Sequence, residues 1–387
     1  MQRVRHFLQT GIFLLLVVVL GIVCMYKYGR FKLTNETDYN EWAADLGSRL
    51  ETDIASSFYQ KFQFVNLNGA VRSVIGQREM NNVQKLNNGK LKMYHMPADQ
   101  EGIDHCAFQM SRISSFLTAR GIPFIYMIPP HSISKYDPQL PSGTFDYAND
   151  NGDRFVEAYR AYGYDVWDLR DMMYEEGIDH YSMVYRTDHH WTTQAGLYTA
   201  QKVIPYFAEV LQCDYDSRVL DPDNYMVETY EAQHLGSYGQ RTGLYYAGID
   251  DFTVYLPMFE TAVECPERGM NGSLVGAFIN MEPLMTKDYT NRYTYDYVLG
   301  GGSAVAECTY INHLSLNDKK ILIVGDSFYR TIIPFMMLSF QEVHYVHRND
   351  SYVLTAEYLE RYDAVLFLYG VDTVLGGAAS YQFPYYE

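Results

Sequence analysis

From about residue 100 onward, short apolar runs alternate with longer segments of helical spacing, and this alternation constrains the fold more than any other feature of the sequence. Strands are predicted at 121–130, 164–169, 321–324, 343–346 and 364–369, and helices at 106–120, 155–161, 191–211 and 328–340. Strands that alternate with helices usually pair in parallel, with helices on both faces of the sheet. We therefore predict a three-layer α/β domain with a mostly parallel sheet over residues 100–387. The stretch of about 214–299, where the alternation weakens, is predicted to be an insertion.

The N-terminal region contains an uncharged run of 21 residues, 6–26, whose centre is dense in Leu and Val. That length is sufficient to span a bilayer as a helix. A cleavable signal peptide is the alternative, but no clear cleavage site of small residues follows the run. We predict that residues 1–32 form a transmembrane signal anchor and that 33–99 form a membrane-proximal segment. The remaining body is expected to lie outside the cytoplasm, at the cell surface or in a periplasm.

Charge and cysteine content exclude some functions. The chain carries a formal net charge of −17, and its first 32 residues contain five basic residues and no acid, so the body is strongly acidic. An acidic surface repels phosphate backbones, which argues against nucleic acid as a partner. Four of the five cysteines, Cys106, Cys213, Cys265 and Cys308, lie in the body without C-x-x-C spacing, which argues against a zinc site. In an extracellular body they allow up to two disulfides, whose pairing the sequence does not reveal.

A candidate nucleophile lies where the predicted strand 321–324 ends. Gly325 and Asp326 break the strand, Ser327 follows at once, and a predicted helix begins at residue 328. A serine at a strand-to-helix turn lies at the carboxyl edge of a parallel sheet, where its hydroxyl is exposed and the helix N-terminus favours negative charge. An ordinary turn explains the same residues, so a catalytic role requires partners elsewhere in the chain.

The strongest local cluster is Thr187-Asp188-His189-His190-Trp191, directly before the long predicted helix. In an extended or turn backbone, residues two apart project to the same side, so Asp188 can orient His190 and leave its second ring nitrogen free. That pair is what a serine nucleophile needs. Two alternatives remain open. In one, Asp188 caps the helix and the histidines pack, and in the other, Asp188, His189 and His190 bind a metal ion.

Several motifs together resemble the DHHW-motif proteins. Besides TDHHW at 187–191 and ILIVGDSF at 321–328, the motifs are NNVQKLNNGKL at 81–91, IPFIYMIPPHSISKYDPQLP at 122–141, LGSYGQRTG at 235–243 and EVHYVHRND at 342–350. These proteins belong to the wider SGNH-like group that includes the alginate O-acetyltransferases of bacterial envelopes. The resemblance covers nearly the whole body, and it implies an SGNH-hydrolase-like fold.

The resemblance also implies roles for particular residues. Ser327 would be the nucleophile, His190 the base and Asp188 its orienting partner, with His189 a neighbouring contact. Substrate binding would involve Arg348, Gln240 and Arg241. A surface ion pair is the alternative role for Arg348, and a tight glycine-rich turn is the alternative explanation of the motif that contains Gln240 and Arg241.

The function implied is the transfer of acetyl groups to sugars of the cell envelope or of an exopolysaccharide, without a metal or other cofactor. Because acetyl-CoA is absent outside the cytoplasm, a multi-pass membrane O-acyltransferase is expected to supply the acetyl groups. Two alternatives use the same fold. One is a carbohydrate acetylesterase with the same three residues, and the other is an inactive, membrane-anchored protein that binds glycans or serves as a scaffold.

Overall fold

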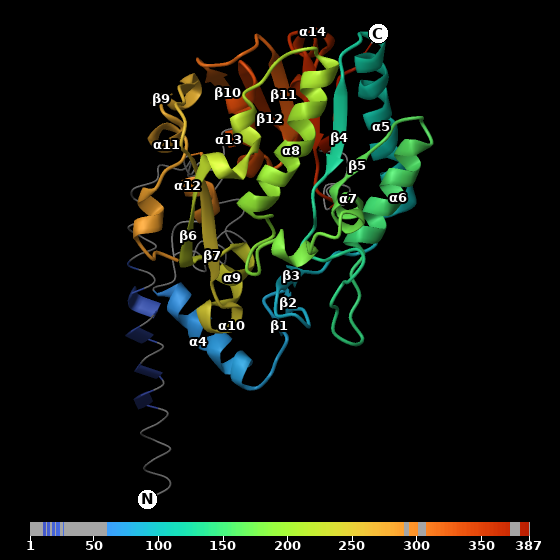
Figure 1. The fold of residues 1–387 in the computed structure, drawn as a ribbon. Coiled ribbons are helices and arrows are strands. Elements are labelled where there is room, and N and C mark those ends of the chain that lie inside the picture. Colours follow the sequence, from blue (N-terminus) through green and yellow to red (C-terminus); the bar gives the residue numbers. More distant parts are fainter. Residues whose placement is uncertain are drawn as a thin grey trace, which may run out of the picture.

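The computed structural model describes residues 60–289, 294–300, 307–371 and 380–386, together with single positions between 11 and 26. Its centre is an eight-stranded sheet with the order β5-β4-β13-β11-β12-β10-β8-β9 (Figure 1). The strands are β4 (Phe124–Ile128), β5 (Trp167–Asp168), β8 (Val263–Cys265), β9 (Met270–Gly272), β10 (Glu307–Asn312), β11 (Lys320–Gly325), β12 (Glu342–His347) and β13 (Ala364–Leu368). The predicted α/β class is therefore confirmed.

The sheet is mixed, which corrects part of the prediction. The five strands from β5 to β12 pair in parallel, whereas β10, β8 and β9 continue the sheet with antiparallel pairs. Strands β8 and β9 are joined by the 3-10 helix Pro266–Arg268, and a connection that short allows only antiparallel pairing. Both strands lie in the predicted insertion, so this part of the chain extends the central sheet.

Apolar side chains of the parallel strands face both layers of helices. In β11, Ile321 and Ile323 point into one core, and Leu322 and Val324 point into the other, because successive strand residues project to opposite faces. All four are fully buried. The continuous apolar run is what a parallel strand covered on both sides requires.

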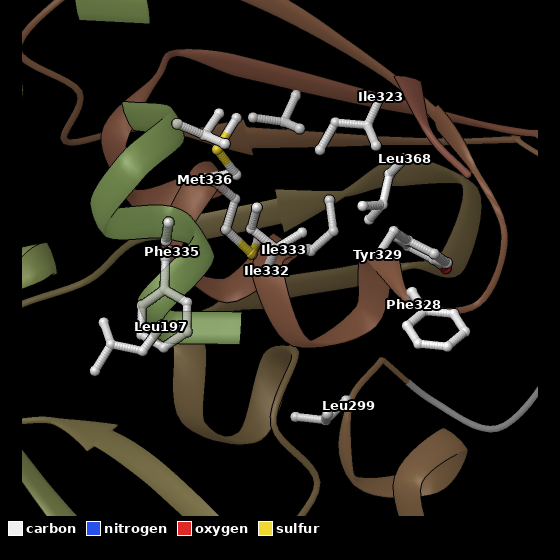
Figure 2. Close-up of a cluster of buried hydrophobic side chains, with 14 of the residues drawn as sticks. Leu197, Leu299, Ile323, Phe328, Tyr329, Ile332, Ile333, Phe335, Met336 and Leu368 are labelled. Atoms are coloured by element: carbon white, nitrogen blue, oxygen red, sulfur yellow. The ribbon is translucent and has the colours of Figure 1, made fainter. Parts of the chain in front are cut away.

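Helices α5 (Gln100–Ala119) and α6 (Ala148–Arg160) pack on one face of the sheet, and α8 (Thr193–Val210) and α13 (Tyr329–Ser339) pack on the other. Figure 2 shows α13 presenting Ile332, Ile333 and Met336 to the apolar cluster. Burying a side chain of that size contributes about 1.5–3 kcal/mol. The predicted helices are confirmed at these places, although the predicted strand 164–169 is shorter and contains only β5. The smaller helices here are α7 (Leu169–Glu175) and α14 (Ala356–Leu359).

A second group of small elements lies below the carboxyl edge of the sheet (Figure 1). It includes the hairpin of β6 (Tyr225–His234) and β7 (Asp250–Pro257), and a small core beneath it is formed partly by α4 and by a three-stranded sheet. The elements are α4 (Lys61–Val74), β1 (Glu79–Met80), β2 (Val83–Lys85), β3 (Leu91–Met93), α9 (Ser237–Thr242), α10 (Leu244–Ala247) and α12 (Thr294–Val298). The short helix α11 (Leu274–Ala277) lies instead beside β9 at the antiparallel end of the sheet. The predicted insertion contributes the hairpin, α9 and α10 to this group.

The predicted transmembrane anchor at 1–32 falls largely outside the described residues. The positions described between 11 and 26 are helical. Within the described part of the chain, no helix has both the length and the apolar character needed to cross a bilayer. The anchor therefore stays a prediction.

Candidate active site

Ser327 lies in the turn between β11 and α13, at the carboxyl edge of the sheet. The Asp326 carboxylate fixes this turn, because its two oxygens accept hydrogen bonds from the backbone N–H groups of Phe328 and Gly370, both at 3.1 Å. Gly325 is needed for close approach, since a Cβ atom there would lie 2.6 Å from the carbonyl oxygen of Leu368. The turn holds Ser327 partly exposed between two buried neighbours.

The loop that contains Asp188 and His190 is anchored at both ends. At one end, Asp250 accepts hydrogen bonds from the N–H and the hydroxyl of Thr187, both at 2.7 Å. At the other end, the indole N–H of Trp191 donates to the carbonyl oxygen of Phe328 at 2.9 Å. The second bond joins this loop directly to the Ser327 turn, so the residues before Trp191 and Phe328 face each other.

The two loops bring the predicted nucleophile and base into contact. His190 Nε2 lies 2.6 Å from Ser327 Oγ, although the residues are 137 positions apart in the sequence. On the other side of the ring, His190 Nδ1 lies 3.3 Å from Asp188 Oδ2. This second contact is within ion-pair distance but lacks hydrogen-bond geometry. Such contacts are often loose in a ligand-free active site and tighten when substrate binds.

Asp188 is almost fully buried and is surrounded by donors. Its Oδ1 accepts hydrogen bonds from the backbone N–H of His189 at 2.7 Å and from the Ser237 hydroxyl at 2.9 Å. Its Oδ2 is bound by His234 Nε2 at 3.0 Å, in addition to the contact with His190. Both carboxylate oxygens are therefore held in place, and Asp188 presents a fixed edge to His190.

Burial and neighbouring charges determine the protonation states of the pair. Burial raises the pKa of Asp188, but the electrostatic attraction of the adjacent His190 and His189 rings outweighs this effect and holds the pKa well below its usual range. Burial lowers the pKa of His190, the charge of His189 lowers it further, and Asp188 partly opposes the shift. The pair therefore favours an ionised carboxylate beside a neutral imidazole, which are the states that a general base and its orienting group need.

Tyr295, from α12, covers the histidine. Its ring stacks on the His190 ring with centroids 4.1 Å apart and planes 12° from parallel, and its hydroxyl donates to the carbonyl oxygen of Ser327 at 3.2 Å. Next to these groups is a cavity of about 250 Å³ lined by Asp188, His189, His190, Ser237, Tyr295 and Asp296. The buried Arg330 forms an ion pair with Asp296 at 3.3 Å. His190 and Asp188 therefore line a small cavity, and Ser327 is in contact with one of its lining residues, His190.

The three residues predicted to bind substrate do not line this cavity. Gln240 and Arg241 lie in α9, three and four residues beyond Ser237, and Arg241 is exposed. Arg348 follows β12 and donates to the hydroxyl of Ser380 at 2.9 Å. A role for these three side chains therefore requires a substrate that extends beyond the cavity.

Two clusters in the described part of the chain have donor atoms close enough together for a metal ion. One is Asp188, His189 and His190, and the other is His95, His131 and Asp146. In the first, a metal would compete with Ser327 and with the donors already bound to Asp188. In the second, the buried ammonium of Lys92 pairs with Asp146, and its positive charge opposes a cation. The present contacts therefore favour proton transfer over metal binding in the first cluster.

Sequence reasoning missed three residues of the site, His234, Ser237 and Tyr295. Ser237 lies within the motif LGSYGQRTG, and His234 directly precedes it, so the motif marked their position but not their contacts. Tyr295 lies in a short helix with no motif that we identified.

Comparisons with known proteins agree with this architecture. A family model described as "SGNH hydrolase-like domain, acetyltransferase AlgX" matches residues 91–247. The match includes Asp188, His190 and His234 and ends before Ser327. It confirms the predicted resemblance to SGNH-like acetyltransferases over this part of the chain and indicates an acyltransferase or esterase. No curated protein matches the chain.

Solved structures share the fold. Bacillus cereus PatB1 has a TM-score of 0.60 at 19% identity, covering 76% of this chain and 97% of the other. A PatB1 structure with a sulfonyl adduct has a TM-score of 0.60 at 18% identity, covering 80% and 100%. A DHHW family protein from Eubacterium siraeum has a TM-score of 0.56 at 17% identity, covering 79% and 96%. At these identities the structural likeness establishes a common fold. One of the proteins that share this fold is a DHHW family protein.

Proposed function

We propose that this chain is an extracytoplasmic O-acetyltransferase that acts on envelope or exopolysaccharide sugars through Ser327, His190 and Asp188. The observation that carries the proposal is the 2.6 Å contact between His190 Nε2 and Ser327 Oγ, beside a buried carboxylate and a small cavity. The match to an SGNH hydrolase-like acetyltransferase domain supports acyl transfer as the reaction class.

In the first half of the reaction, His190 accepts the proton of Ser327 at Nε2 while the Ser327 oxygen attacks the carbonyl carbon of an acetyl donor. Asp188 stabilises the positive charge that develops on the imidazole, because its Oδ2 lies 3.3 Å from Nδ1. His190 then returns the proton to the leaving group. The product is an acetyl ester on Ser327.

In the second half, a sugar hydroxyl takes the place of the donor. His190 removes its proton, the sugar oxygen attacks the acetyl-serine, and Ser327 recovers its proton from His190. If water is the acceptor, the same steps make an acetylesterase, which is the second candidate function. The choice between the two depends on how well the acceptor excludes water from the cavity beside Tyr295.

The location and the partners are part of the proposal. The uncharged run at 6–26 and the acidic body favour a chain anchored in the membrane with its body outside the cytoplasm. A multi-pass membrane O-acyltransferase is the proposed acetyl supplier, because an enzyme outside the cytoplasm has no acetyl-CoA. Gln240, Arg241 and Arg348 are proposed to contact glycan units outside the cavity.

The test is mass spectrometry of the full chain, purified in detergent and incubated briefly with a small acetyl ester. We expect one acetyl group on the peptide containing Ser327, and none in Ser327→Ala. The matched comparison is Ser237, the other serine beside Asp188 in the site. An adduct on Ser237 would disprove the assigned nucleophile, and the absence of any adduct would favour the scaffold alternative. Adding an oligosaccharide separates transfer from hydrolysis, since transfer yields acetylated sugar and hydrolysis yields acetate.

A further inference from the structure

Two cysteines that are 43 positions apart in the sequence, Cys265 and Cys308, lie in neighbouring strands of the central sheet. Cys265 ends β8 and Cys308 lies in the neighbouring strand β10. The pairing of Glu264 with Ile311 places Cys265 across from Tyr310, and Cys308 lies two residues away from Tyr310 on the same face of the sheet. Both cysteines belong to the same apolar core and are almost fully buried, and their thiols interact closely enough to shift each other's pKa in opposite directions. All four cysteines in the described part of the chain are free thiols, and Cys265 and Cys308 are the two that lie in neighbouring strands.

The groups around the pair activate one thiol. Arg268 Nε donates to Cys308 Sγ at 3.1 Å, and its two terminal nitrogens are buried without a hydrogen-bond partner among the described residues. A buried guanidinium requires a compensating anion, and the Cys308 thiolate supplies it. The hydrogen bond from Cys265, followed by Arg268, lowers the pKa of Cys308 to about 6 against the effect of burial.

Cys265 remains protonated beside a base. The hydrogen bond with Cys308 and then burial raise the pKa of its thiol. Its sulfur lies 3.6 Å from Glu267 Oε2, an oxygen that also accepts from the N–H of Thr309 at 3.1 Å. The pair is therefore asymmetric, with a thiolate next to a cation and a thiol next to a carboxylate. The thiolate is the form that attacks in thiol–disulfide exchange, so Cys308 is the attacking cysteine of the pair.

We propose that Cys265 and Cys308 form a redox site that closes to a disulfide by exchange with an external disulfide. The Cys308 thiolate attacks one sulfur of the oxidant, whose other sulfur leaves as a thiolate. Cys265 then transfers its proton to Glu267 and attacks Cys308 Sγ, which releases the second sulfur of the oxidant. The two cysteines lose two electrons and one proton, because Cys308 is already a thiolate and only Cys265 carries a proton. The oxidant gains the two electrons and becomes one thiol, which receives that proton from Glu267, and one thiolate.

Closure would join the ends of the segment 266–307, which contains Tyr295, the ring stacked on His190. Closure would also remove the anion that compensates Arg268, and the Arg268 guanidinium lies beside Gly300 in the same segment. The redox state is thereby linked to the segment that covers the catalytic histidine. Formation of the Cys265–Cys308 disulfide in the cell rests on the extracytoplasmic location proposed above. The ability of the two thiols to form it does not depend on that location.

The test equilibrates the full chain in detergent with mixtures of reduced and oxidised glutathione, starting from both redox states, followed by alkylation and peptide mass spectrometry. We expect a linked peptide that contains Cys265 and Cys308 and is lighter by two hydrogen atoms, with Cys106 and Cys213 alkylated as internal controls. Two alkylated thiols at every glutathione ratio would overturn the proposal, as would glutathione on Cys308 without linkage. The assay uses no acetyl donor, so its outcome is independent of the proposed acyl transfer.

A pair of arginine variants tests the role of the cation. Arg268→Gln removes the charge that stabilises the reduced thiolate, so the midpoint should shift at least about threefold toward reducing mixtures. Arg218→Gln is the matched control, because Arg218 is exposed, pairs with Asp216 and lies outside the cysteine cluster. An unchanged midpoint in Arg268→Gln, with thermal melting like that of the control, would overturn the thiolate assignment. Limited proteolysis within 266–307 should slow on oxidation of the wild type but not of Cys265→Ser.

Discussion

Asp188→Asn separates a catalytic role of Asp188 from a structural one, because the surrounding donors determine how the amide must sit. Oδ1 accepts from the backbone N–H of His189 and from the Ser237 hydroxyl, and the backbone donor cannot become an acceptor. The amide oxygen should therefore take this place, and the NH2 group should face His190 and His234. An NH2 group donating to His190 Nδ1 forces the ring proton to Nε2, so the imidazole can no longer accept the proton of Ser327.

The expected loss of turnover is about 10⁴-fold, the size of effect seen when an orienting carboxylate becomes an amide and fixes the wrong tautomer. That loss corresponds to about 5.5 kcal/mol of transition-state stabilisation. The cost in folding should be smaller, about 1–3 kcal/mol for the buried polar groups whose pairing is disturbed. Acetyl-ester turnover and thermal melting of the full chain measure the two effects.

Asp250→Asn is the matched control. Asp250 anchors the same loop, because its carboxylate accepts from the backbone N–H groups of Arg186 and Thr187 and from the Thr187 hydroxyl. Among the described residues, these hydrogen bonds of the carboxylate involve no histidine side chain. It should lose a similar amount of folding stability and no more than about tenfold in turnover, since the tautomer of His190 is unaffected. If Asp188→Asn keeps turnover within tenfold of the wild type, or if both variants lose it equally, the orienting role of Asp188 is wrong.

Four further outcomes are expected. Ser327→Ala and His190→Ala should each abolish nearly all turnover, and the double variant should be scarcely worse, because members of one catalytic unit are not additive; two independent losses that multiply would contradict the unit. Since burial and the charge of His189 lower the pKa of His190, the acid limb of the pH profile of kcat/KM should have its midpoint below the usual value of 6.5. His189→Gln should keep most activity and move this midpoint upward. A midpoint above 6.5 in the wild type would be inconsistent with a neutral buried base. Turnover should survive EDTA. A loss of turnover that zinc or manganese restores would instead identify Asp188, His189 and His190 as metal ligands. Protease added to intact cells should digest the body, and recovery of a soluble chain that begins near residue 30 would favour a cleaved signal peptide over an anchor.

The local sequence determined most of the elements that carry the site. The continuous apolar run of β11 and the helical spacing of α8 and α13 are set by whether one or both faces of an element are buried, and that pattern is visible residue by residue. The turn at Ser327 and the segment 187–191 were recognisable as candidates, because their residue types and their positions directly before predicted helices are also visible in the local sequence. The short length of β5 and the antiparallel edge of the sheet were not recognisable, because the pairing of β5 with β4 and of β10 with β12 and β8 depends on neighbours that are distant in the sequence.

The tertiary structure alone decided which side chains meet. Nothing local to His234, Ser237 or Tyr295 indicates contact with Asp188 or His190, because each comes from a separate element whose position depends on the packing of the whole chain. The same holds for Gln240, Arg241 and Arg348, whose motifs were visible but whose positions relative to the cavity were not. Cys265 and Cys308 are the sharpest case, since only the pairing of β8 with β10 brings these two of the four described cysteines into neighbouring strands. A sequence pattern reports the environment along one element, whereas a site is defined by the directions in which several elements point.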